Sequence, residues 1–127
     1  MIGQTTILEK TVKCAAAVVA FTICKPGADD EHAVVAAAVG DKMIGVFQHP
    51  TTVAEEAVRI MFKGITRVKY GGTVAFGDLL TSDGSGRAVA AAPAAGVNNR
   101  IIGVAMCAGA VDDIGFCLLG QGQVQGG

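Results

Sequence analysis

The sequence predicts an all-β fold, a small β-barrel or jelly-roll-like β-sandwich with two pseudo-repeated halves and an extended N-terminal arm. Most apolar runs are short, rich in β-branched residues and bounded by turn residues, as strands are. Similar segments recur in the same order along the chain. Of the 127 residues 51% are hydrophobic but only 5% aromatic, so we expect one core of small aliphatic side chains.

Four strands are expected in the first half of the chain. They comprise residues 18–24, 33–39, 43–47 and 58–62. Pro26-Gly27 ends the first of these runs and Gly40-Asp41 ends the second. Thr52-Val53-Ala54-Glu55 competes with this pattern, because it forms a capping box followed by apolar residues at helical spacing. The matching segment of the second half is strand-like, so we expect at most a turn or two of helix within residues 51–56.

Five further strands are expected in the second half. They comprise residues 74–76, 79–81, 87–89, 101–106 and 114–119. Ser82-Asp83-Gly84-Ser85-Gly86 separates two of these runs and is the strongest hairpin signal in the chain. A turn near Asp112-Asp113 is expected to join the last two.

The two halves correspond segment by segment. Val19-Ala20-Phe21 recurs as Val74-Ala75-Phe76, and His32-Ala33-Val34 aligns with Arg87-Ala88-Val89. Residues 42–46 likewise match residues 100–104, and Glu55-Glu56 matches Asp112-Asp113. We therefore expect an N-terminal arm over residues 1–10 and a single β domain over residues 11–127, with pseudo-repeats at about 11–65 and 66–122.

Charge and composition argue against several classes of partner. The 10 basic and 11 acidic residues are scattered and give a net charge of −1, so no nucleic-acid partner is expected. The longest apolar stretch, residues 14–24, is shorter than the roughly 20 residues of a spanning helix, and no secretory signal opens the chain. We expect no membrane partner and a soluble protein synthesised in the cytoplasm.

No group of residues in the sequence suggests catalysis or a metal site. The four cysteines, Cys14, Cys24, Cys107 and Cys117, form no Cys-x-x-Cys pair, and we expect reduced, half-buried thiols, although a disulfide stays open. His32 and His49 are the only histidines, and neither lies in a catalytic motif. The acidic pairs are expected in solvated turns, with a weak calcium site at residues 29–31 as the minor alternative. We expect no enzyme, no metal and no cofactor; an enzyme subunit completed by another chain is a third alternative.

Lys42 supplies the main alternative function. Asp41-Lys42-Met43 follows one small apolar run and precedes another, a pattern similar to the lysine-bearing hairpin of lipoyl and biotinyl carrier domains. However, Arg100 stands at the matching position of the other half, which favours a repeated structural position. A carrier or ligand-binding β-barrel is therefore the runner-up hypothesis.

The second half resembles the capsid decoration (cement) proteins of tailed bacteriophages. The segments that carry the resemblance are Gly77-Asp78-Leu79-Leu80, Asp83-Gly84-Ser85-Gly86-Arg87 and Ile102-Gly103-Val104-Ala105, followed by an acidic turn and a last aliphatic strand. The resemblance implies a structural virion protein on the outer capsid surface, made in the host cytoplasm, that binds the major capsid protein and stabilises contacts between capsomers. It also implies a small homo-oligomer, a dimer or a trimer, with an N-terminal arm that pairs with the capsid.

The expected capsid-binding residues lie in two exposed segments. The arm contributes Thr5, Thr6, Ile7, Leu8, Glu9 and Lys10, because an extended segment can add a strand to an open sheet edge. The segment Phe47-Gln48-His49-Pro50 contributes Phe47 and His49 from an expected turn. The hairpin tip at residues 82–86 is a further expected exposed segment.

Overall fold

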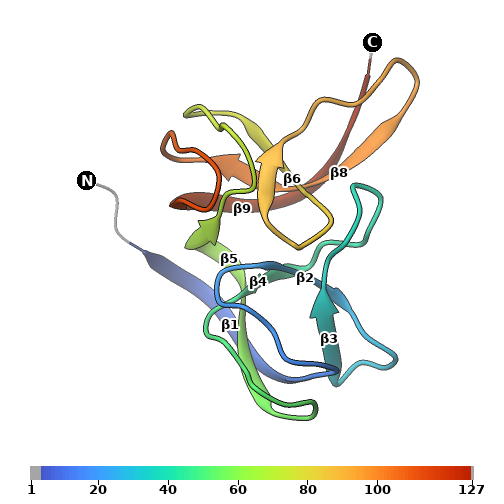
Figure 1. Cartoon of the computed structure of the whole chain (residues 1–127), viewed down its shortest axis with the longest axis vertical. Helices are drawn as coiled ribbons and strands as arrows, with labels where there is room; N and C mark the ends of the chain where they lie inside the picture. The colour runs from blue at the N-terminus through green and yellow to red at the C-terminus, as the bar shows by residue number, and fades with distance from the viewer. Residues whose placement is uncertain (1–3, 127) are drawn as a thin grey trace.

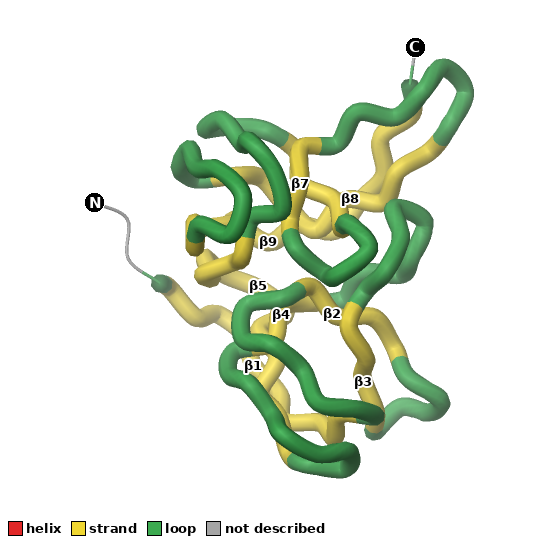
Figure 2. Tube along the Cα trace, in the orientation of Figure 1, coloured by secondary structure: helices red, strands yellow, loops and turns green. Residues whose placement is uncertain are grey.

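The computed structural model describes residues 4–126 and confirms the all-β class. Nine strands are present, and no helix occurs among the described residues (Figures 1 and 2). The strands are β1 (Thr5–Cys14), β2 (Ile23–Pro26), β3 (His32–Val35), β4 (Gly45–Phe47), β5 (Ala57–Lys69), β6 (Leu79–Ser82), β7 (Ala88–Ala90), β8 (Asn98–Ala105) and β9 (Ile114–Gln125).

The strands form two adjoining barrel-like rings that share β5. The sheet order is β1-β3-β2-β4-β5-β9-β8-β6-β7, and β1 pairs with β5 to close the first ring. The second ring is closed less evenly, by one parallel bridge between Tyr70, just after β5, and Ala88 of β7. In Figure 1 the first half is the lower lobe and the second half the upper lobe, with β5 passing between them.

Equivalent residues occupy equivalent backbone positions in the two rings. Cys14 pairs in parallel with Ala33 in the first ring, as Tyr70 does with Ala88 in the second. Glu55 (φ 69°) and Asp112 (φ 67°) both adopt the left-handed conformation in the turn before the last strand of their ring. The acidic residues aligned by sequence are thus equivalent turn positions.

At one core position the first ring has a small residue and the second ring a large one. The residues packed against this position are larger in the first ring and smaller in the second. The Tyr70 ring is fully buried, and its hydroxyl donates a hydrogen bond to the Cys107 carbonyl (2.7 Å). A Cβ at Gly109 would lie 2.6 Å from Tyr70 Cδ2, and a Cβ at Gly115 would overlap the ring. In the first ring the small Cys14 contacts Thr51 and shares its cluster with Val58, which occupy the positions of Gly109 and Gly115. Each ring is therefore filled by its own combination of large and small residues.

The expected strand at residues 18–24 forms only from Ile23, where β2 begins, and the expected strand at residues 74–76 is a loop. Residues 18–20 and 74–76 form no strand, although Val18 and Val74 are buried. The Thr51 N–H donates to the Val18 carbonyl (3.1 Å), and the Val74 N–H donates to the Gly109 carbonyl (2.9 Å). Val18 and Val74 thus line the core from loops that bond to other loops, whereas Val19 (56%) and Phe76 (67%) are exposed.

The expected helical turn at residues 51–56 is absent. This segment is a series of bends and turns, in which the Glu56 carboxylate accepts a hydrogen bond from the Thr52 N–H (3.1 Å). This contact comes from Glu56 and not from Glu55, the residue that the capping box would use, because the Glu55 carboxylate bonds to His32 (2.8 Å). The residues that follow are part of β5, which pairs with β1.

Residues 5–10 do not form an arm separate from the domain. They are the first part of β1, which pairs antiparallel with β5 from Thr5↔Ile65 to Lys13↔Ala57. The length of β5, which spans both rings, provides the partner edge for this segment. Residues 1–3 of the expected arm lie outside the described residues.

Candidate interaction surfaces

The strand β1 presents an open edge along the residues expected to bind the capsid. On one side β1 pairs with β5, whereas on the other side β3 reaches only Lys13 and Cys14. Residues 5–12 therefore have no strand partner on their second edge among residues 4–126. An edge of this kind can accept a strand from another chain.

A β-bulge exposes two apolar side chains on this part of β1. The register with β5 shifts around Ile7, and the side chains of Ile7 and Leu8 are 71% and 50% exposed. Gly64 of β5 lies opposite the bulge with φ of 123°, where a Cβ would overlap the Thr5 carbonyl oxygen. The close approach of the two backbones thus requires glycine at this position.

Phe47 cannot contact a partner, which corrects the sequence prediction. Its side chain is fully buried in a cluster with Val58 and Ile60, and its N–H donates to the Thr22 carbonyl (2.9 Å). Phe47 is the last residue of β4 and pairs with Ile60 of β5. Burial of an aromatic side chain in this sparse core outweighs the turn character of the residues that follow it.

His49 is half-buried and its ring bonds within the chain. The Arg59 N–H donates to His49 Nε2 (3.1 Å), and His49 Nδ1 lies 3.2 Å from the Pro50 carbonyl oxygen. This arrangement fits a neutral ring that holds the turn after β4 against β5. The ring edges are thus occupied by contacts of the turn itself.

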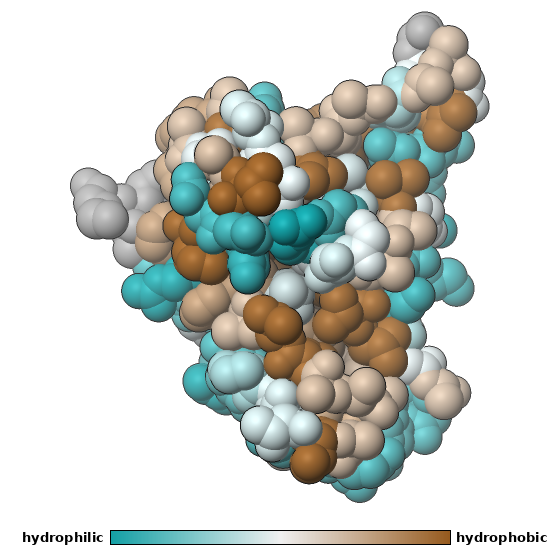
Figure 3. Space-filling model, viewed as in Figure 1, coloured by the Kyte–Doolittle hydropathy of each residue, from teal (hydrophilic) through white to brown (hydrophobic). Residues whose placement is uncertain are grey.

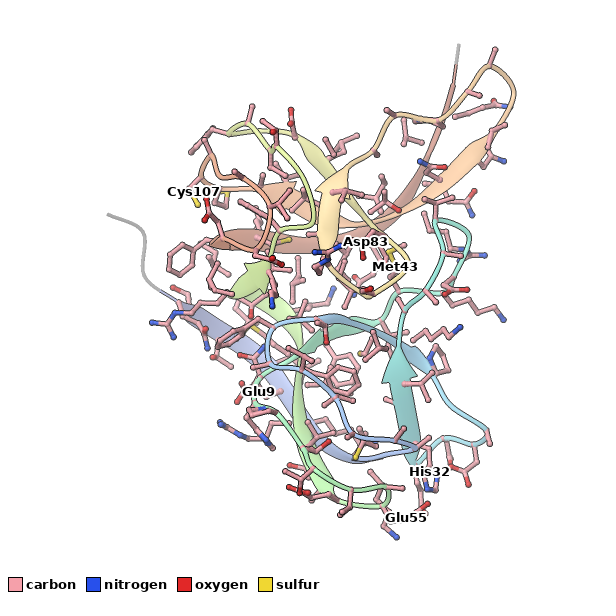
Figure 4. The ribbon with its side chains drawn as sticks, in the orientation of Figure 1. Glu9, His32, Met43, Glu55, Asp83 and Cys107 are labelled. Atoms are coloured by element: carbon pink, nitrogen blue, oxygen red, sulfur yellow. The ribbon has the colours of Figure 1, made fainter. Side chains whose placement is uncertain are left out.

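The tip of the β6–β7 hairpin is exposed only at Gly84 and Ser85, whereas Ser82 and Gly86 on either side are buried. The Asp83 carboxylate accepts hydrogen bonds from the N–H groups of Ser85 (2.8 Å) and Arg87 (2.9 Å). The Ile23 N–H donates to the Gly86 carbonyl (2.7 Å), which joins the tip to the first half of the chain. Asp83 lies at the junction of the two lobes in Figure 4.

Equivalent charged clusters clamp a turn in each ring. His32 Nδ1 lies 2.6 Å from the Asp29 carboxylate and Nε2 lies 2.8 Å from Glu55, as Figure 4 shows for the His32–Glu55 pair. The hydrogen bond to Asp29, and then that to Glu55, raises the pKa of His32, whereas His32 lowers the pKa of Asp29. In the second ring Arg87 contacts Asp83 (2.9 Å) and Asp112 (3.1 Å). These clusters have a structural role in tying each turn to its ring.

An exposed apolar band crosses the outer face of the second ring, at positions that were not among the predicted binding residues. Four side chains point away from the core at directly paired positions of four strands: Ile65, Leu118, Val104 and Leu79. Leu118 is 43% exposed and Leu79 is 42% exposed. Thr5 pairs with Ile65, so the apolar band continues onto the open edge of β1.

A signal for the apolar band was present in the last strand. Ile114, Phe116 and Leu118 alternate with Gly115, Cys117 and Leu119, so both faces of β9 are apolar. Only one face is in the core, and Phe116 on the other face is covered in part by the Arg67 guanidinium, 6.0 Å from the ring centre. Figure 3 shows apolar side chains interspersed with polar ones over one face of the molecule. Contiguous exposed apolar residues of this kind mark interaction sites.

Lys42 does not lie on a hairpin of the carrier type. It is exposed in the loop between β3 and β4, and these two strands flank β2 instead of pairing with each other. Its neighbour Met43 is buried at the junction of the two lobes (Figure 4). The topology therefore separates Lys42 from the two-stranded tip that the carrier hypothesis requires.

The cysteines are free thiols. Cys14, Cys24 and Cys117 are fully buried and Cys107 is half-buried. Burial raises the pKa of the Cys24 and Cys117 thiols to about 12, so both are protonated at neutral pH. No group of three His, Cys, Asp or Glu residues suited to a metal ion occurs within residues 4–126, and no helix there is long and apolar enough to cross a membrane.

Comparison with known proteins identifies a similar fold. No family model matches the chain, and no curated protein matches it. Among solved structures, the chain is similar to the N base of head fiber gp8.5 of bacteriophage phi29, with a TM-score of 0.69 and 17% sequence identity. The similarity covers 89% of this chain and 93% of that chain. At this identity the likeness shows that the two proteins share a fold.

Proposed function

We propose that this protein is a non-enzymatic structural component of a phage virion that binds the outer capsid surface and stabilises contacts between capsomers. The exposed apolar band that continues onto the open edge of β1 is the observation that carries the proposal. The shared fold with a phage head fiber base supports the virion setting. In this proposal the major capsid protein is the partner that covers the apolar band.

The size of the apolar band fits a contact that is weak when one copy binds and becomes firm when many copies bind a capsid lattice. Covering four partly exposed aliphatic side chains would contribute about 2–4 kcal/mol. The open edge of β1 would add backbone hydrogen bonds to a strand of the partner. Because a shell presents the same site many times, self-association into a dimer or trimer would convert this modest contact into firm attachment.

The first test is quantitative mass spectrometry of purified particles from the source of this chain. A copy number comparable to that of the major shell protein supports the proposal. Absence of the chain from intact particles overturns it.

The second test uses purified shells that lack this protein. Leu79→Ser with Leu118→Ser removes the two most exposed side chains of the apolar band, and we expect co-sedimentation with shells to be lost. Val53→Ser is the matched control, because Val53 is 61% exposed in a turn of the first ring and lies outside the apolar band. Equal binding by the double variant and the control would show that the apolar band is not the capsid contact.

A further inference from the structure

A groove between the two rings carries an unusual combination of apolar and cationic side chains. Its volume is about 490 Å³, and its lining comes from the β3–β4 loop, β5, β8 and β9. Met43, Ile44 and Phe62 form the apolar part, and Lys42, Lys63 and Arg100 form the cationic part. We refer to it as the junction groove. Lys63 pairs with Leu8 of β1, so the junction groove adjoins the open edge of that strand.

No carboxylate lines the junction groove. Lys42, Lys63 and Arg100 make no ion pair with any residue described by the structure, unlike Lys25, Arg59, Lys69 and Arg87. Asp41 is adjacent to Lys42 in sequence, but its carboxylate pairs with Lys25 (3.2 Å) and accepts a hydrogen bond from the Ala37 N–H (2.8 Å). The positive charge of the groove is therefore left without a counter-charge from the chain.

The groove is held in place by hydrogen bonds between the rings. The Arg100 N–H donates to the Val39 carbonyl (2.7 Å), and Gln121 Nε2 donates to the Ile44 carbonyl (3.0 Å). These bonds fix the β3–β4 loop against β8 and β9, as the loop reaching toward β8 in Figure 1 shows. A ligand would meet a largely preformed site, which reduces the entropy cost of binding.

We propose that the junction groove binds an acidic peptide segment of another protein, one whose carboxylates alternate with apolar side chains. The three cations match carboxylates, and the exposed parts of Ile44 and Phe62 match aliphatic or aromatic side chains. A nucleic acid would match the charge, but the net charge of the whole chain is −1 and no further basic residue lines the groove. The ligand proposed here differs from the capsid contact proposed above, and the two sites adjoin where Lys63 pairs with Leu8 of β1.

The test measures the binding of labelled probes by fluorescence anisotropy at low salt. The probe is a short fluorescein-labelled peptide of alternating Asp and Leu, and the comparison probes are the Asn–Leu peptide and an oligothymidylate of equal charge. We expect saturable binding of the Asp–Leu peptide that weakens as salt is raised. No saturable binding, equal affinity for the Asn–Leu peptide, or tighter binding of the oligothymidylate would each overturn the proposal.

Paired variants locate the site. Lys42→Glu with Lys63→Glu should weaken Asp–Leu peptide binding by about tenfold or more. Lys10→Glu with Lys13→Glu is the control, because it makes the same charge change at exposed positions of β1 outside the groove. If the glutamate variant fails to fold, Lys42→Gln with Lys63→Gln replaces it in the same binding measurement. Circular dichroism checks that each variant is folded. Equal losses in the groove and control variants would show that the attraction is non-specific.

Discussion

The exchange of residue sizes between the two rings predicts a strong energetic coupling between Tyr70 and Gly115. In the second ring the Tyr70 ring occupies the space that a side chain at Gly115 would need. In the first ring Cys14 and Val58 hold the equivalent positions, and both are fully buried. The double variant Tyr70→Cys with Gly115→Val places the residues of the first ring at the equivalent positions of the second. It should therefore restore packing that either substitution alone destroys.

The structure sets the scale of each change. Tyr70→Cys leaves a cavity in the core and removes the hydrogen bond to the Cys107 carbonyl (2.7 Å), which together cost about 3–5 kcal/mol. Gly115→Val forces a side chain into the ring and costs about 1–3 kcal/mol or more. Additive effects would total about 4–8 kcal/mol, comparable to the whole stability of a small domain. We expect the double variant to cost about 1–3 kcal/mol, a coupling of at least about 1 kcal/mol.

Urea unfolding followed by far-UV circular dichroism measures the coupling, since the Tyr70 substitution removes the chain's one tyrosine and with it the fluorescence signal. The control pair is Gly115→Val with Val58→Ala, two changes in different core clusters that should add. If the Tyr70–Gly115 double variant is no more stable than the worse single variant, the compensation argument is refuted. If the single variants do not fold and the double variant does, the argument is supported directly.

Three further predictions concern the turns and the edge strand. Because the pKa of His32 is raised in the folded state, the stability that His32 contributes is complete below its ordinary pKa of 6.5 and is lost as pH rises through the folded-state pKa. The pKa of Asp29 is lowered, so the stability that Asp29 contributes is lost as pH falls through the folded-state pKa. His32→Arg, which copies Arg87, should remove the alkaline loss in thermal melts across pH, and an unchanged profile would contradict this assignment. Deleting residues 1–9 removes four paired residues of β1 and should lower the melting temperature as well as prevent docking. An unchanged melting temperature would mean that this part of β1 adds nothing to the stability of the fold. Gly64→Ala should destabilise the protein by about 1–3 kcal/mol in urea unfolding. Gly120→Ala is the control and should be nearly neutral, because the space around its Cβ is open. Equal urea midpoints for the two variants would count against the close approach of β1 and β5.

Strands with strong β-branched character were predictable because their pattern is local. The runs at residues 58–62 and 114–119 fall in β5 and β9, and the run at 101–106 falls in β8 except for its last residue. Residues 18–20 of the run at 18–24, and the run at 74–76, were not separable from strands, because a loop that buries Val18 or Val74 needs the same apolar residue as a strand. Which of the two occurs depends on Thr51 and Gly109, more than thirty positions away along the chain.

The candidate surfaces were less predictable, since they depend on register between distant strands. The apolar band exists because Ile65, Leu118 and Val104 are direct neighbours across three strands. No local pattern determines which face of β9 meets the core. For Phe47 the prediction was wrong for a different reason. The turn pattern after β4 gave no information on the burial of the Phe47 side chain, which packs in the core.

The correspondence between the halves explains how a chain with so few aromatic residues leaves apolar area for binding. Both rings repeat the same strand order, and each holds a turn with a basic side chain between two carboxylates, His32 in one and Arg87 in the other. Backbone pairing and these charged clusters hold each ring together. Outward-facing side chains therefore need not contribute to the stability of their own ring. The second ring carries Leu79 and Leu118 at such positions, while the first presents the edge of β1, so the two halves share a frame and differ in what they offer to partners.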